Sequence, residues 1–173
     1  MFDINSTTMR TAWLIALLFP VMVLAQDLAA ERELYPLAHK DEQTAAELLK
    51  LTADADTAVP TQTAYRGAAL MIAAQFASGI SGKLKLFNEG KDLMAKAAEA
   101  APESVEVRFL RMTVQENAPG FLLYKGDLQQ DKDFILGHFS AEKDAGLKKM
   151  IRTHARTSSV YSDEEKAKLL PVR

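Results

Sequence analysis

Residues 64–77 have the sequence AYRGAALMIAAQFA, in which only Arg66 and Gln75 are strongly polar. The alanines and Leu favour a helix, and a helix that is apolar nearly all round is buried on several sides. Gly67 and the alanines keep this helix thin, so that neighbouring helices can approach it closely. A membrane-spanning helix takes about 20 apolar residues, and this run is shorter and contains an arginine. The stretch therefore predicts a buried helix at the centre of an all-α domain.

The segments around this stretch also favour helices. Residues 84–101 carry apolar side chains at helical spacing on one face, and Pro102 ends the pattern. Residues 105–117 are apolar on two sides, which is typical of a helix between two neighbours. Helices are expected at residues 31–53, 62–77, 84–101, 105–117, 127–139 and 141–157, followed by a short helix that ends at Leu170. This gives about six helices in one domain, residues 26–173.

Several residues mark the expected ends of these helices. Pro36 is expected in the first turn of the first helix or at a break in it. Asp127 and Ser140 are candidate caps for the helices that follow them. Ser162 and Glu165 have the spacing of a capping box at the start of the last helix. Residues 78–82 and 54–60 are expected as loops.

Composition limits the kinds of function that the chain can have. The 173 residues contain no cysteine, so disulfides and a lipid-attachment cysteine are excluded. The formal net charge is −2, whereas a nucleic-acid-binding domain carries a basic excess. Alanine, leucine, lysine and glutamate dominate, which again favours helices over strands. We expect no nucleic-acid partner.

The N-terminal residues have the three parts of a secretory signal peptide. Arg10 precedes the uncharged run 12–25, and the small residues Val23 and Ala25 precede a cleavage site before Gln26. Residues 1–25 are therefore predicted to be a signal peptide, with Met9 as an alternative start. An uncleaved anchor and a buried core helix are the other interpretations of this run. Cleavage would release an exported protein, periplasmic or secreted, without a stable membrane anchor.

The spacing of Gly90, Met94, Ala97 and Pro102 resembles the second helix and closing proline of a tetratricopeptide repeat. Gly67 stands where the preceding helix of such a repeat has a small residue, but the intervening segment is too long for a strict repeat of about 34 residues. The resemblance covers about residues 62–117. It implies stacked antiparallel helical hairpins, a short α-solenoid, and a protein-binding role.

Residues 108–119 also resemble a family of exported bacterial proteins, and this resemblance implies no particular activity. Within the same segment lies the most notable polar cluster. Its members, with Tyr65 from the central helix, are Arg108, Arg111, Gln115, Glu116 and Asn117. Glu116 falls on the same arc as apolar residues and therefore needs a partner, because an unpaired buried charge costs several kcal/mol. The cluster is expected to be an ion-pair and hydrogen-bond network, or a polar groove that binds a ligand.

A second cluster gives residues 141–157 a basic face, formed by Lys148, Lys149, Arg152 and Arg156. It lies opposite Leu147, Met150 and Ile151. Such a face either meets an anionic partner or membrane surface, or is simply exposed to solvent. His154, on the apolar side, is expected to be a partly buried histidine with a hydrogen-bond partner.

No segment has the residue spacing of a known catalytic, cofactor-binding or metal-binding motif. Residues 79–83, GISGK, are too short for a phosphate-binding loop and Leu84 replaces its hydroxyl residue. The three histidines lack metal-ligand spacing. Asp127, Asp131 and Asp133 lack the glycine and glutamate of a calcium loop and are expected on a solvated face or helix N-terminus.

The sequence therefore predicts a protein that is not an enzyme and has no cofactor, metal or catalytic site. The leading hypothesis is an exported interaction module that presents a helical surface to a protein or peptide. The alternative is a carrier of a small ligand, with a pocket between helices near Arg108, Arg111 and Tyr65. An open groove with exposed aromatic residues would favour the module, and a deep closed pocket the carrier.

Overall fold

The computed structural model describes residues 28–170, and this part of the chain is helical without strands. The all-α prediction is confirmed, but there are eight α-helices rather than about six. They are α1 (Ala29–Ala38), α2 (Glu42–Leu51), α3 (Pro60–Phe76), α4 (Gly79–Ala100), α5 (Val105–Asn117), α6 (Leu128–His138), α7 (Ala145–Thr157) and α8 (Asp163–Leu169), with a 3₁₀ turn η1 (Gly120–Leu122). The predicted signal peptide, residues 1–25, lies outside the described residues.

The prediction of one helix over residues 31–53 is wrong, because the chain forms two helices there. Pro36 lies inside α1, and the chain turns after Ala38. Asp41 then starts α2: its backbone is extended and its Oδ1 accepts a hydrogen bond from the Thr44 amide at 2.8 Å. A side-chain cap of this kind satisfies one of the free N–H groups at a helix start.

The central helix α3 is buried on most sides, as its sequence predicts. Its connection to α4 is shorter than expected, because the predicted loop at 78–82 is mostly the first turn of α4. Gly79 enters that helix with a φ of 71°, a conformation that favours glycine. The segment between Gly67 and Gly90 is thus helical for nearly its whole length, and the chain reverses direction between α3 and α4. Gly67 and Gly90 lie against each other where these two helices pack together.

The second half of the chain agrees with the sequence in two places and departs from it at two expected caps. Asp127 precedes α6 but its side chain makes no capping hydrogen bond. The bounds of α5 are those predicted, with Ser104 as its cap. The capping box of Ser162 and Glu165 at the start of α8 is confirmed. Ser140, however, caps no helix: α7 begins at Ala145, and Asp144 Oδ1 accepts from the Leu147 amide at 2.9 Å.

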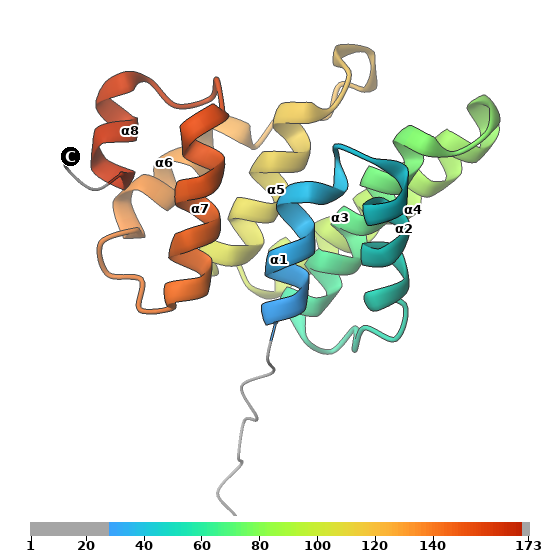
Figure 1. Cartoon of the computed structure of the whole chain (residues 1–173), viewed down its shortest axis with the longest axis horizontal. Coiled ribbons are helices and arrows are strands. Elements are labelled where there is room, and N and C mark those ends of the chain that lie inside the picture. The colour runs from blue at the N-terminus through green and yellow to red at the C-terminus, as the bar shows by residue number, and fades with distance from the viewer. Residues whose placement is uncertain (1–27, 171–173) are drawn as a thin grey trace, which may run out of the picture.

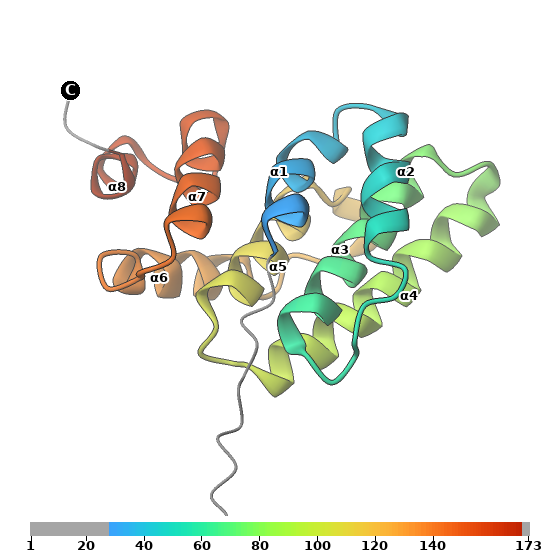
Figure 2. The same cartoon turned by 60° about the horizontal axis from the view of Figure 1, so that its bottom comes forward.

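The helices pack around α1, α3 and α5. Helix α3 contacts α1, α2, α4 and α5, and α1 contacts α7 as well as α2. Figures 1 and 2 show α1 between α7 and the α3–α4 pair. The C-terminal ends of α1, α5 and α7 lie on the same side of the molecule as the turn between α3 and α4, at the top of Figure 1. No helix within residues 28–170 is both long and apolar enough to cross a membrane.

Candidate binding groove

A cavity of about 740 Å³ opens between α1, α3, α4, α5 and α7, with η1 at its edge. We refer to it as the groove. Each of these five helices contributes a buried apolar side chain to its wall: Tyr35, Ile72, Phe87, Phe109 and Met150. Pockets that bind small molecules have volumes of roughly 300–1,000 Å³ and are lined mainly by apolar groups. The groove therefore has the size and the lining of a binding site.

Three large apolar side chains stand exposed where the groove meets solvent. Ile80 and Phe121 are each 80% exposed, and Leu84 is 41% exposed. We call these three residues the lips of the groove. Leu123, next to Phe121 in the chain, is 89% exposed but does not line the groove. Apolar residues gathered at the mouth of a cavity are typical of a surface that a partner covers.

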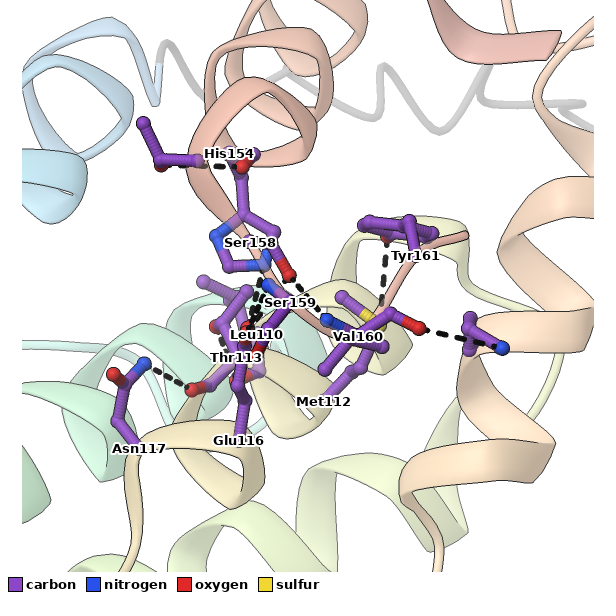
Figure 3. A network of polar contacts seen from close by, with 12 residues as sticks. Leu110, Met112, Thr113, Glu116, Asn117, His154, Ser158, Ser159, Val160 and Tyr161 are labelled. Carbon is purple, nitrogen blue, oxygen red and sulfur yellow. Dashed lines mark hydrogen bonds and ion pairs between the residues drawn. The ribbon is translucent and has the colours of Figure 1, made fainter. Parts of the chain in front are cut away.

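A polar network joins α5 and α7 at one wall of the groove (Figure 3). Glu116 Oε2 lies 2.9 Å from His154 Nε2, while its Oε1 accepts from the Ser158 hydroxyl at 2.8 Å and the Ser159 amide at 3.2 Å. Burial opposes ionisation of Glu116, but these hydrogen bonds outweigh it and hold its pKa below the ordinary value. The carboxylate is thus ionised near neutral pH, with two hydrogen-bond donors on Oε1 and the imidazole of His154 beside Oε2.

The residue types of this network resemble those of a catalytic triad, but their order differs. The Ser158 hydroxyl donates to the carboxylate of Glu116 and not to the imidazole of His154, which would have to accept its proton in a nucleophilic mechanism. A carboxylate whose pKa is lowered is a poor base near neutral pH. The geometry fixes the C-terminal end of α7 to α5 and does not activate the hydroxyl.

A second polar contact closes the wall between α1 and α5. The Tyr35 hydroxyl is hydrogen-bonded to Thr113 Oγ1 and lies 3.4 Å from the Leu110 carbonyl oxygen. Burial raises the pKa of Tyr35 far above its ordinary value, so the phenol stays neutral. The polar atoms of this wall are therefore satisfied internally, and the groove presents mostly apolar surface.

Arg108 and Arg111, which the sequence places in a candidate groove, point instead toward α6. Both bind Asp131, which has no solvent exposure: Arg111 contacts both carboxylate oxygens, at 2.6 and 2.8 Å, and Arg108 contacts one at 2.9 Å. The guanidinium group of Arg108 also stacks over Phe134 at 4.2 Å. Of the two expectations for Asp131, a helix N-terminus is confirmed, because the residue lies in the first turn of α6, and a solvated face is wrong, because the side chain is the buried counter-ion of two arginines.

The other members of the polar cluster expected from the sequence lie in three different places. Gln115 donates to Asp127 at 3.0 Å, beside the arginine network. Tyr65 is completely buried and donates to Glu106, which also pairs with Arg32. Glu116 and Asn117 line the groove, and the Asn117 side chain donates to the Thr113 carbonyl at 2.8 Å. The structure thus brings only these last two to a cavity.

The basic face of α7 is divided by its contacts. Lys148 and Arg152 pack over the Phe139 ring and donate to the carbonyls of Glu142 and Leu169. Lys149 and Arg156 are exposed to solvent. Only half of the predicted face is therefore presented outward.

None of the three lip residues stands out in the sequence as a functional candidate. Ile80 and Leu84 lie in the segment that was expected to be a loop and the start of a helix. Their position at one cavity depends on the packing of five helices.

The described residues also contain no group of three or more His, Asp or Glu side chains placed to hold a metal ion. Comparisons with protein-family models, with curated proteins and with solved structures found no match.

Proposed function

We propose that this protein is a non-enzymatic interaction module that binds an amphipathic peptide segment of another protein in the groove. The observation that carries the proposal is the exposure of Ile80 and Phe121, 80% each, at the mouth of an apolar cavity. When a partner covers large apolar side chains at a concave site, the burial favours binding by about 25 cal/mol for each Å² of apolar surface removed from water. An amphipathic helix laid in a groove is a common way of covering such a site.

The proposal includes the expected architecture of stacked antiparallel hairpins, similar to tetratricopeptide repeats. It is supported by the contacts of α1 with α2, α3 with α4 and α5 with α6, and by the packing of Gly67 on Gly90. Helical arrays of this kind offer concave surfaces to peptides. The predicted signal peptide supports action outside the cytoplasm, in the periplasm or after secretion.

Selection from a displayed library of random peptides tests this function. The whole chain is immobilised, and the recovered peptides are measured against the wild type, the Ile80→Ser/Phe121→Ser variant and the control variant Leu123→Ser. Peptides are expected to bind the wild type and the control equally and to lose at least about tenfold in affinity for the lip variant, which is about 1.4 kcal/mol. Recovered peptides that bind all three proteins alike would overturn the proposal, as would a selection that recovers none.

The alternative is a carrier of a small apolar ligand, and the volume of the groove favours it as a second candidate. About 740 Å³ is within the range of small-molecule pockets. Native mass spectrometry distinguishes the two functions. A carrier purified from its own source is expected to hold a molecule of fixed mass, which the Ala74→Phe variant should release because Ala74 lines the cavity.

A further inference from the structure

We infer that the groove's partner is an acidic amphipathic peptide, whose apolar side chains enter the groove and whose carboxylates face Lys40 and Lys83. This inference rests on the proposed function and adds the charge of the partner. It follows from the ionisable residues that line the groove, which are Lys40, Lys83, His39, His154 and Glu116. Two of these are exposed lysines, and the only carboxylate among them is already bound.

Lys83 lies among the lips on α4. Residues three and four positions apart share one face of a helix, so Ile80 lies on the same face as Lys83 and as Leu84, and all three line the groove. Its ammonium group donates to the Gln75 carbonyl at 2.9 Å and keeps donor capacity, because an ammonium has three N–H groups. A partner that covers Ile80 and Leu84 must therefore also meet this positive charge.

Lys40 provides the second positive charge, from the turn that follows α1. It follows His39, whose pKa is lowered by burial and by the positive charges of Lys40 and His154. The lining of the groove thus contains two lysines, one from α4 and one from the turn after α1, among mostly apolar residues.

Glu116 offsets these two lysines only in part. Its carboxylate is paired with His154 and accepts hydrogen bonds from Ser158 and Ser159. The carbonyl ends of α1, α5 and α7 also border the groove, and each carries about half an elementary negative charge, but this effect falls off within the last turn of the helix. The long, exposed side chains of the two lysines remain the charged groups that a partner's side chains meet. A partner with carboxylates beside its apolar anchors would pair with the lysines, whereas a lysine-rich partner would be repelled.

The test compares the charge of the peptides that different forms of the whole chain select. The library displays random peptides of about 12 residues, which as helices are roughly 18 Å long. The test variant is Lys40→Glu/Lys83→Glu. The control variant Lys85→Glu/Lys96→Glu makes the same change in net charge at two exposed lysines of α4 that do not line the groove. Each selection is repeated at high salt, which screens exposed charges.

Peptides selected by the wild type and by the control variant are expected to be rich in both apolar and acidic residues. They should bind the Lys40→Glu/Lys83→Glu variant about tenfold more weakly, and that variant should select peptides without an acidic excess. Apolar peptides of neutral or basic composition that still need Ile80 and Phe121 would overturn the inference and leave the proposed function intact. Recovered peptides that do not depend on the lips, or recovery of none, would overturn both.

Discussion

The carbonyl oxygen of Gly67 occupies the space that a side chain on Gly90 would need: an added Cβ at Gly90 would come within 2.5 Å of it. The same Cβ would lie 2.7 Å from Met71 Cγ. We expect Gly90→Ala to lower the free energy of unfolding by about 1–3 kcal/mol, the usual cost of overpacking a core. Urea denaturation followed by circular dichroism measures this change.

Gly137 in α6 is the matched control, because nothing lies within 4 Å of its added Cβ. Gly137→Ala is expected to raise the free energy of unfolding by about 0.5–1 kcal/mol, since alanine is the better helix former. A stabilising effect of both substitutions would contradict the close approach of α3 and α4.

Removing the carboxylate of Asp131 leaves Arg108 and Arg111 without their shared buried counter-ion. Breaking a buried pair from one side typically costs about 3–5 kcal/mol. We expect Asp131→Asn to lower the midpoint of urea denaturation accordingly, while Asp133→Asn, exposed on the same helix, changes stability by less than about 0.5 kcal/mol. Equal effects of the two substitutions would show that the arginines do not depend on Asp131.

The sequence predicted those helices whose ends are marked by local chemistry. The Ser162–Glu165 capping box identifies α8, and Pro102 marks the end of α4, because both signals depend only on neighbouring residues. The division of α1 from α2 was missed although Asp41 is a good cap, because the apolar spacing continues across it. A local signal was present there, and the helical periodicity concealed it.

The contacts of the candidate site depend on tertiary packing and were predicted only in part. The position of Glu116 among apolar residues indicated that it needs a partner, and the structure supplies His154 from α7. Nothing in the spacing of Asp131 distinguishes it from the exposed Asp133, since burial depends on which face of α6 meets α5. The groove likewise joins residues from α1 to α7, so no single segment of sequence reveals it.

The Glu116–His154 pair should make stability depend on pH. Because the pKa of Glu116 is lowered in the folded protein, its contribution is complete above the ordinary value of 4.5 and is lost as the pH falls through the folded pKa. Glu116→Gln is expected to be about 1.5 kcal/mol less stable than the wild type at neutral pH, the value of a hydrogen bond to a charged group. The difference in free energy of unfolding between the wild type and Glu116→Gln should become smaller below pH 4.5.

Denaturation midpoints over a series of pH values measure this narrowing. Glu89→Gln, which changes an exposed glutamate of α4, is the control and should follow the wild type throughout. If the difference in stability between Glu116→Gln and the wild type stays constant at all pH values, the charge of the Glu116 carboxylate does not contribute to stability.

The lips should bind an apolar dye even without a partner. Anilinonaphthalene sulfonate becomes fluorescent on apolar surface, and its sulfonate suits the lysines beside the groove. We expect strong fluorescence with the wild type and a severalfold loss with Ile80→Ser/Phe121→Ser.

The control Leu123→Ser removes a side chain that is even more exposed, 89%, but lies outside the groove. Equal losses in both variants would mean that the dye reports exposed apolar area in general. A loss confined to the lip variant, with stability unchanged within about 0.5 kcal/mol as for other surface substitutions, would place the dye in the groove.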